Sequence, residues 1–317
     1  MEATSTDSSV NKKEVFMLVD GSAIVHRAYH AMPPFTNSDG TPTGAVHGFF
    51  SMLFKLIQQL KPAHIVVAFD RPKPTFRQQL YVGYQAQRPK MESDLSEQFG
   101  MIIEILNAAK IMQIGVDGYE ADDIIGTVAQ RAKNMGNVVY IVTGDRDMLQ
   151  LINHKTLVLM PIKGISEVKI HDDASVLEKY GVEPHKIIEL KALTGDASDN
   201  YPGVPGIGPK TAVNLIDKYG NVENIYKHLD DIAVKNKNVA QKLIDGAESA
   251  TLSHTLATIL TDVPFKCDFD DCLTSKIDVP AFKNILEQYE FRTLPKRLDE
   301  IFVQKAETKK QNQMKLL

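Results

Sequence analysis

Five short clusters of carboxylates constrain this chain more than any other feature of its sequence. They lie in VFMLVDGS, IVVAFD, YEADD, TGDRD and TGDASDN, mostly where an apolar run ends, and comprise Asp20, Asp70, Glu120, Asp122, Asp123, Asp145, Asp147, Asp196 and Asp199. Such apolar runs predict buried strands, whose ends converge at one edge of an α/β sheet. Carboxylates gathered there would repel each other unless positive charge lay among them. The sequence therefore predicts a divalent-metal site.

The spacing within these clusters suits ligands for hard cations. Glu120 and Asp123 are three residues apart near an expected helix start, so both side chains reach one face. Asp145 and Asp147 alternate at a strand end. Mg²⁺ and Mn²⁺ prefer such oxygens, and two ions about 3.5–4 Å apart can clamp both reacting oxygens of a phosphodiester. Helix caps and turns could explain single clusters, but caps rarely come in pairs at ligand spacing.

The order of the expected elements predicts an α/β fold. Strands are expected at 14–20, 64–69, 111–116 and 137–142, and helices at 44–60 and 120–134. Strands that alternate with helices indicate a largely parallel sheet covered on both faces. Residues 156–170 are expected to add a small pair of strands, and the chain from residue 221 onward looks mostly helical.

Residues 71–94 differ in composition from the expected sheet. Basic side chains are interleaved with aromatic ones, namely Arg71, Lys73, Arg77, Arg88 and Lys90 with Phe76, Tyr81 and Tyr84. This mixture is typical of an element that contacts nucleic acid. A solvated surface helix with a few anchoring rings explains it equally well, so the composition alone leaves both interpretations open.

A glycine- and proline-rich stretch, NYPGVPGIGPK, follows the last acid cluster at residues 200–210, and a helix is expected at 211–219. Glycines at this spacing allow sharp turns that present backbone N–H groups to a phosphate, with a helix N-terminus behind them. A P-loop is excluded, because Pro209 separates Gly208 from Lys210. The stretch indicates a helix–hairpin–helix grip on DNA, with a tight connection between helices as the alternative.

Composition narrows the class of protein. The 317 residues suffice for one or two domains, and no apolar run approaches the roughly 18 residues of a membrane span. Cys267 and Cys272 are few for a disulfide scaffold and lack clustered partners for a metal, so a reduced, cytoplasmic setting is expected. The net charge of −4 argues against a uniformly basic coat, although acids concentrated in one site would leave the remaining surface positive.

Taken together, these stretches resemble the 5′-nuclease domain of bacterial DNA polymerase I, in the flap endonuclease superfamily. The resemblance runs from about residue 16 to 298 and is carried by VDGSAIVHRAYHA, PTGAVHGF, VVAFDRPKPTFR, GYEADDIIGT, IVTGDRDMLQL and LTGDASDNYPGVPGIGPKTA. It implies a PIN-like core with a mixed, mostly parallel sheet, a helical arch over the active site, and a C-terminal helix–three-turn–helix clamp on DNA.

The resemblance also implies an activity, namely hydrolysis of DNA 5′ ends and flaps by a monomer that uses two Mg²⁺ or Mn²⁺ ions in replication or repair. All nine acids fall on the family's metal-site positions, with Asp20 to Asp123 expected at one ion and Asp145 to Asp199 at the other. Arg27 falls on a basic position near the scissile phosphate, Tyr84 on an arch aromatic that can stack on a base, and Arg88 on an arch basic position. The expected DNA contacts are Arg77, Gly203, Val204, Gly206, Ile207, Gly208 and Lys210, and the family's loop can also hold K⁺.

One position departs from the family pattern. After the arch tyrosine the family usually has lysine, whereas this chain has Gln85. Glutamine can donate a hydrogen bond but carries no charge, and losing one preorganised donor typically slows a reaction ~10²–10³-fold. Slow cleavage, or compensation by Arg27, Lys73 or Lys90, is therefore expected.

Two other functions compete with a nuclease. A DNA-junction binding protein with little catalysis is favoured only by Gln85, and a Toprim-like phosphoryl-transfer enzyme would leave the Gly-rich loop unexplained. The expected boundaries are a disordered leader at 1–13, a nuclease core at 14–182 with an arch at 71–94, a helical DNA-binding region at 183–303 with its motif near 200–219, and a flexible tail at 304–317. The end at Leu317 favours a stand-alone protein, although a fragment of a polymerase would look identical.

Overall fold

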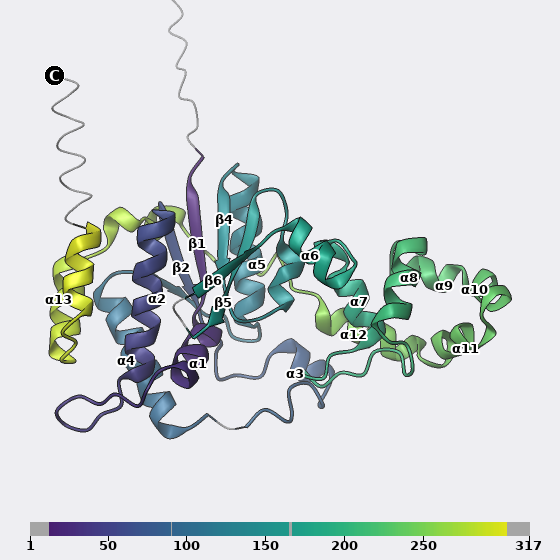
Figure 1. Ribbon diagram of the computed structural model, residues 1–317, viewed down its shortest axis with the longest axis horizontal. Helices are drawn as coiled ribbons and strands as arrows, with labels where there is room; N and C mark the ends of the chain where they lie inside the picture. The colour runs from purple at the N-terminus through teal and green to yellow at the C-terminus, as the bar shows by residue number, and fades with distance from the viewer. Residues whose placement is uncertain (1–12, 90, 165–166, 303–317) are drawn as a thin grey trace, which may run out of the picture.

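A six-stranded, mostly parallel sheet forms the centre of the protein (Figure 1). The computed structural model describes residues 13–89, 91–164 and 167–302. The strand order is β3-β2-β1-β4-β5-β6, and only β5 and β6 pair antiparallel. The strands are β1 Val15–Asp20, β2 His64–Ala68, β3 Met112–Ile114, β4 Val138–Val142, β5 Thr156–Lys163 and β6 Glu167–His171. The expectation of a mixed, mostly parallel sheet is confirmed.

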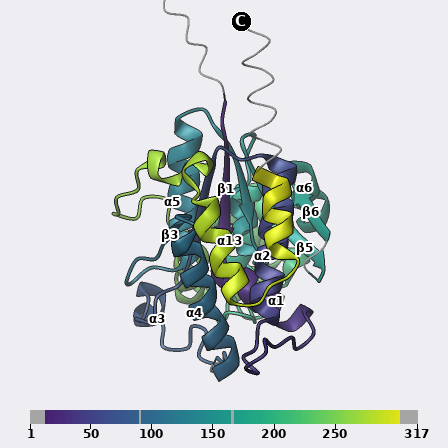
Figure 2. The ribbon, with the colours of Figure 1, turned by 90° about the vertical axis from the view of Figure 1, so that its left-hand side faces the viewer.

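Alternating side chains of β1 divide the core between the two faces of the sheet. Phe16 and Leu18 pack with α5 (Ala121–Asn134) and with helices of the C-terminal region. Met17 and Val19 pack with α2 (Gly44–Leu60), α4 (Ser93–Ala108) and α13 (Val279–Gln288), which Figure 2 shows in front of the sheet. Because both faces are covered, β1 is apolar along almost its whole length.

The sheet reverses its strand order at β1. From β1 the chain adds β2 and β3 on one side, and later β4, β5 and β6 on the other. The connections that follow β1 and β4 therefore run in opposite directions from the carboxyl ends of these two strands. Open α/β sheets bind ligands in the crevice that such a divergence leaves. Helix α1 (Gly21–Ala31) begins directly after β1, so Asp20 lies at this point.

Residues 71–94, where a helical arch is expected, are mostly turns and irregular backbone in their described part. In the described part of the segment, a single short helix, α3 (Phe76–Leu80), is followed by turns, and α4 begins at its end. Pro72, Pro74 and Pro89 cannot lie inside a helix, and Gly83 adds flexibility that disfavours one. Residues 1–12 of the expected leader and the whole expected tail lie outside the described residues.

The chain after β6 is helical and extends to one side of the sheet in Figure 1. Its helices are α6 Asp173–Tyr180, α7 Ile187–Thr194, α8 Pro209–Tyr219, α9 Val222–Lys227, α10 Leu229–Lys235, α11 Lys237–Asp245 and α12 Ala247–Ala257. A return segment, residues 258–268, then leads back to the sheet, where Leu273 pairs with His64. None of the helices in the described part of the chain is long and apolar enough to span a membrane.

Candidate active site

Three of the acids lie where strands of the sheet end, and backbone or hydroxyl donors hold each of them in place, the Asp147 amide donating to Asp145 at 2.8 Å. Asp20 caps α1, with one oxygen 2.9 Å from the Ala23 amide and the other 2.7 Å from the Thr143 hydroxyl. Asp70 follows β2 and accepts a 2.9 Å hydrogen bond from the amide of Ala121 at the start of α5. The third, Asp145, follows β4. A carboxylate that caps a helix or a turn can therefore also serve as a metal ligand here, because the cap fixes its position at this end of the sheet.

The acids near β1 form the first carboxylate group, and their own charges oppose ionisation there. Burial, with the charges of Asp70 and Asp145, raises the pKa of Asp20 to about 7. Burial, followed by the charges of Asp145 and Asp20, raises the pKa of Asp122 well above its ordinary value. Burial also raises the pKa of Glu120 to about 7, although a neighbouring arginine opposes this shift. A cation placed among these carboxylates would relieve the repulsion.

The second carboxylate group consists of Asp147, Asp196 and Asp199. One oxygen from each lies within 4.8 Å of the others, which is close enough for a shared cation. Lys191 of α7 already reaches two of them, because its ammonium group donates to Asp147 and, at 2.5 Å, to Asp196. Burial outweighs this lysine at Asp147, whose pKa is raised to about 7. At Asp196, Lys191 and the hydrogen bonds from Ser198 together overcome burial, and the pKa is lowered.

A cavity of about 520 Å³ lies beside this second group. It is lined by Gly144, Asp145, Arg146, Asp147, Tyr180, Ile187, Lys191, Asp196 and Ser198. The hydroxyl of Tyr201 is buried near the same acids, and its charged neighbours include Lys191 and Asp147. No described residue provides that hydroxyl with a hydrogen-bond partner. An all-oxygen donor set with an orphaned buried hydroxyl fits a hydrated hard cation.

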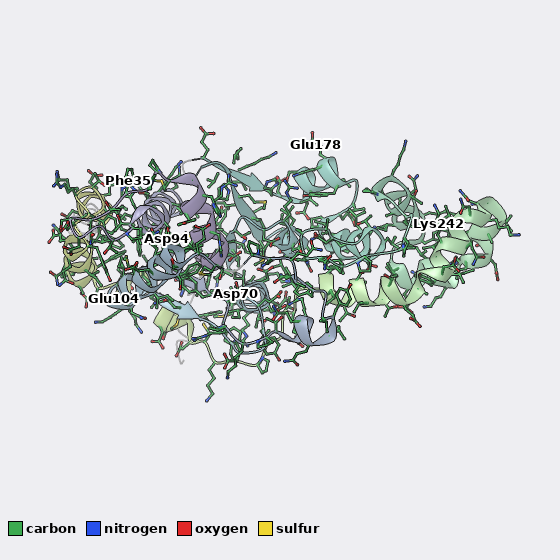
Figure 3. The ribbon with its side chains drawn as sticks, turned by 90° about the horizontal axis from the view of Figure 1, so that it is seen from below. Phe35, Asp70, Asp94, Glu104, Glu178 and Lys242 are labelled. Carbon is green, nitrogen blue, oxygen red and sulfur yellow. The ribbon has the colours of Figure 1, made fainter. Side chains whose placement is uncertain are left out.

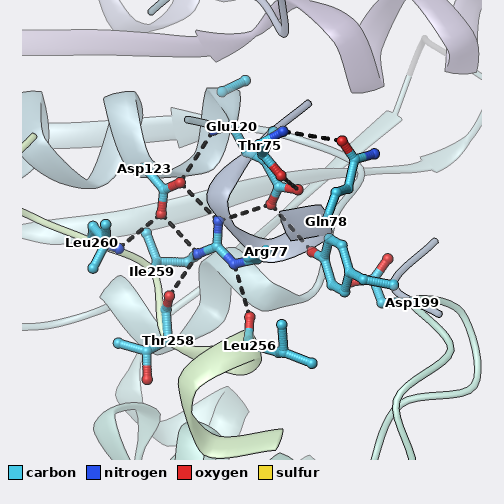
Figure 4. A network of polar contacts seen from close by, with 12 residues as sticks. Thr75, Arg77, Gln78, Glu120, Asp123, Asp199, Leu256, Thr258, Ile259 and Leu260 are labelled. Carbon is cyan, nitrogen blue, oxygen red and sulfur yellow. Dashed lines mark hydrogen bonds and ion pairs between the residues drawn. The ribbon is translucent and has the colours of Figure 1, made fainter. Parts of the chain in front are cut away.

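Figure 4 shows that Arg77 and Asp123 form a closed internal network instead of facing a ligand. Arg77 is 2% exposed and makes five hydrogen bonds, to Glu120, twice to Asp123, and to the carbonyls of Leu256 and Thr258. The oxygens of Asp123 also accept from the backbone amides of Glu120 and Leu260. This corrects two expectations: the donors of Arg77 are turned away from DNA, and Asp123 has no oxygen left for a metal.

Two predicted arch residues bind an acid of the second group. The Gln85 amide nitrogen lies 3.0 Å from one oxygen of Asp199, and a guanidinium nitrogen of Arg88 lies 2.8 Å from the same oxygen. The backbone N–H of Gln85 also donates to the Asp199 carbonyl, and Gln85 has a left-handed φ of 53°. Gln85 and Arg88 therefore lie at the acid cluster, where both donate to one carboxylate and the charge of Arg88 offsets that of Asp199.

Tyr84 and Arg27 are also bound within the protein. Tyr84 is 5% exposed, stacks on Tyr201 with ring centres 6.4 Å apart, and donates to Glu120 at 3.2 Å. The expected ring that stacks on a base is therefore buried in this structure. Arg27 donates to the carbonyls of Ile162 and Gly164 in the β5–β6 hairpin, so its guanidinium fastens that hairpin.

The Gly-rich loop is held in shape by close backbone packing. Gly203 has φ of 62°, and a Cβ there would lie 2.1 Å from the Gly195 nitrogen, so only glycine fits. Val204 and Ile207 are 2% and 5% exposed, so their side chains are buried in the protein. A partner of the loop would therefore meet its backbone groups and not these two side chains. Gly206 and Gly208, by contrast, are exposed along with Lys210 at the start of α8.

Two basic residues of the site were missed from the sequence. Lys242 of α11 donates to the Gly206 carbonyl at 3.1 Å, and Figure 3 shows it far from Asp70, in the helical region. No sequence signal links it to the loop, since the two are 36 residues apart. Lys191 could have been found, because it precedes Asp196 by little more than one helical turn.

Both parts of the chain match known protein families. Residues 15–181 match the family model "5′-3′ exonuclease, N-terminal resolvase-like domain", and residues 182–280 match "5′-3′ exonuclease, C-terminal SAM fold". A 5′-3′ exonuclease of Aquifex aeolicus is 38% identical over 92% of this chain and 97% of its own length. DNA polymerase I of Bacillus subtilis is also 38% identical, over 92% of this chain. The chain spans about a third of the length of this polymerase.

Solved structures agree on the fold. The T5 D15 protein co-crystallised with metal ions superposes with a TM-score of 0.62 at 23% identity, covering 91% of this chain and 99% of that one. The catalytic core of Rad2 in complex with DNA substrate gives a TM-score of 0.57 at 20% identity, covering 92% of each chain. With two matching family models and a close relative covered along almost its whole length, the chain belongs to the 5′-3′ exonuclease family.

Proposed function

We propose that this protein is a divalent-metal-dependent, structure-specific nuclease that hydrolyses phosphodiester bonds at the 5′ ends and flaps of DNA. One observation carries the proposal: two carboxylate groups meet at the switch point of the sheet, beside a cavity. The charge of Asp145 acts on Asp20 and Asp122 of the first group and on Asp147 of the second. All-oxygen ligand sets favour Mg²⁺ or Mn²⁺ among biological metals.

The residues divide into roles by their contacts. Asp20, Asp70, Glu120 and Asp122 would hold one ion, Asp147, Asp196 and Asp199 a second, and Asp145 would lie between them. Bound ions of this kind lower the pKa of water and polarise a phosphoryl oxygen. Thr143 and the amide of Ala121 orient Asp20 and Asp70, so two ligands are positioned before substrate arrives.

DNA would be gripped at a second place, in the helical region. The exposed ammonium of Lys210 and the exposed backbone of Gly206 and Gly208 would bind phosphates of the duplex downstream of the cleaved bond. Gly203, expected to join them, is buried, and its amide donates to the Ser253 hydroxyl. Lys242 already donates to the Gly206 carbonyl. Its ammonium group would share this carbonyl with the K⁺ ion expected at the loop, or take the place of that ion. A monomer in a cytoplasmic setting, acting in replication or repair, remains part of the proposal.

Cleavage of a 5′-labelled flap substrate tests the proposal. Asp145→Asn removes charge from both carboxylate groups with little change in shape, and we expect cleavage with Mg²⁺ or Mn²⁺ to fall ~10²-fold or more. Chelation by EDTA should abolish cleavage by the parent protein. Asp173→Asn, an exposed acid in the first turn of α6, is the matched control and should cleave normally. Undiminished cleavage with Asp145→Asn or with EDTA would refute the metal mechanism.

A junction-binding protein with weak catalysis is the second candidate, favoured by the contacts of Asp199. Gln85 and Arg88 both bind one oxygen of this acid, and Gln85 stands where the family usually has lysine. Gln85→Lys is expected to raise the rate at saturating Mg²⁺ by ~10-fold or more, because it restores a charged donor beside the scissile bond. If this variant cleaves no faster than the parent, Gln85 does not limit turnover.

A further inference from the structure

Cys267 and Cys272 lie side by side where the return segment reaches the sheet. Their sulfur atoms are 3.7 Å apart, and both are free thiols in the structure. Cys272 is 3% exposed and lies at the end of η3, the 3₁₀ turn Phe269–Cys272, whereas Cys267 is half-buried. One thiol can therefore be reached from solvent while the other is sheltered directly behind it.

The surroundings give the two thiols different reactivity. A hydrogen bond from Cys272, helped by the charge of Arg131, lowers the pKa of Cys267. Arg131 is fixed there, because it donates to the carbonyls of Phe265 and Val263 and lies over the Phe265 ring. The same contact with Cys267, together with burial, raises the pKa of Cys272. Since the thiolate is the nucleophile, Cys267 is the residue that reacts first.

The fold allows the two sulfurs to close. A disulfide requires about 2.05 Å between sulfur atoms, so the pair must approach by roughly 1.6 Å. Only the short segment from Cys267 to Cys272 has to adjust, and it carries a single 3₁₀ turn capped by Asp268. The neighbouring Leu273 is paired with His64 of β2, so the adjustment would fall on the half-exposed side, at Cys267.

We propose that Cys267 and Cys272 form a redox-active pair that oxidises to an intramolecular disulfide in the presence of a peroxide. The Cys267 thiolate attacks hydrogen peroxide, breaks the O–O bond and becomes a sulfenic acid, releasing hydroxide. The Cys272 thiol then attacks that sulfur, the S–S bond forms, and water leaves. Two thiols lose two electrons in total, and one peroxide is reduced to two waters.

The disulfide would fasten the end of the return segment. Earlier in the same segment, the Thr258 carbonyl accepts from Arg77 and the Leu260 amide donates to Asp123. Neither cysteine belongs to the acid groups, so oxidation should stabilise the fold without changing the ligands of a metal. The proposal is independent of the nuclease proposal and can fail or hold without it.

Mass spectrometry of the full chain after treatment with hydrogen peroxide tests the proposal. The parent should lose about 2 Da and yield a peptide that links Cys267 to Cys272. With Cys272→Ser, no disulfide can form, and dimedone should trap a sulfenic acid on Cys267. With Cys267→Ser, dimedone labelling should fall at least tenfold, because the remaining thiol is buried and protonated.

Thermal unfolding provides the second readout. Oxidised parent protein should unfold a few degrees above the reduced protein, and dithiothreitol should reverse the change. Both serine variants should show no such shift with peroxide, which separates the disulfide from other oxidation. Two outcomes would overturn the proposal: both thiols of the folded parent still alkylated after peroxide, or disulfides found only between chains.

Discussion

Two basic side chains that pair with acids of the site, Arg77 and Lys191, have sharply different surroundings. Arg77 is 2% exposed, and protein groups accept all five of its hydrogen bonds. Lys191 has a side chain that is 16% exposed, binds Asp147 and Asp196, and lines a cavity of about 520 Å³. One cation is sealed inside the structure, whereas the other lies at the edge of a space that a ligand can enter.

This difference separates acids that build the fold from acids that can serve chemistry. Asp123 is completely buried and is neutralised by a rigid, planar guanidinium that fits both its oxygens. Asp147 and Asp196 share one flexible ammonium, which only partly offsets their charge and which lines the cavity. The same sequence signal, a pair of acids near a helix or strand end, therefore has two physical outcomes.

The largest expected effect comes from removing the sealed cation. Arg77→Met leaves Asp123 buried without its partner and should lower the free energy of unfolding by about 3–5 kcal/mol. Lys191→Met is the matched control, since its acids can take up water from the cavity, and it should cost less than about 1.5 kcal/mol. Urea unfolding at neutral pH without metal measures both. Equal losses would remove the distinction between the two regions.

The pH dependence of stability should report the acids that the cations fail to neutralise. Asp20, Glu120 and Asp147 have pKa values of about 7 in the folded protein, above their ordinary values near 4. The folded state therefore binds more protons than the unfolded state between these values, and stability should fall as pH rises from about 4 to 7. We expect a loss on the order of 2 kcal/mol in EDTA, levelling above pH 7.5. Urea titrations across this range measure it.

Added Mn²⁺ should reverse that loss, because ionised carboxylates bind the metal. Stability that stays constant or increases from pH 5 to pH 7.5 in EDTA would show that burial and mutual repulsion do not raise the pKa values of these acids.

A smaller effect is expected on metal binding when the cation beside the cavity is removed. Lys191→Met frees oxygens of Asp147 and Asp196 and removes a competing positive charge. The second Mn²⁺ ion should bind about tenfold more tightly, which corresponds to about 1.4 kcal/mol. Isothermal titration with Mn²⁺ checks this, with Lys186→Met, a partly exposed lysine just before α7, as control. Weaker binding by Lys191→Met would mean that the lysine positions the acids for the metal.

The smallest effect is expected at Tyr201. Its buried hydroxyl has no partner among the described residues, so Tyr201→Phe should leave metal-free stability unchanged or raise it by under about 1 kcal/mol. Mn²⁺ affinity should fall a few-fold, since the hydroxyl can bond a metal-bound water. Thermal unfolding with and without Mn²⁺ separates the two effects. Destabilisation of the metal-free protein would show that the hydroxyl has a partner within the fold.

Much of the sheet was predictable because its residues obey a simple periodicity. β1, β2 and β4 are buried apolar runs, and each begins within one residue of its predicted start. The segment 71–94 was not predictable in the same way. Its basic and aromatic residues left nucleic-acid contact and a surface helix both open, and the arch was implied only by the family resemblance. Prolines and Gly83 disfavour a long helix there, and Tyr84 packs on a ring from a distant loop. Such long-range pairings leave no local pattern.

The acid site was predictable as a group but not in its internal division. Strand ends and helix starts indicated where carboxylates would gather, and the observed caps on Asp20 and Asp70 agree with this. The separate fate of Asp123 was hidden, because its partner Arg77 lies 46 residues away in a segment that looked exposed. Charge identity is visible in a sequence, whereas the partner of a buried charge is decided by packing.

The network around Arg77 has a consequence for the order in which the protein assembles. Arg77 completes its hydrogen bonds only when the carbonyls of Leu256 and Thr258 are present to accept them. These two residues follow Arg77 by 179 and 181 positions in the sequence. During synthesis, the amino-terminal part leaves the ribosome long before these groups exist. The nascent chain must therefore carry an unfinished charge pair until the return segment emerges, and a chain that stops before residue 256 would never complete it.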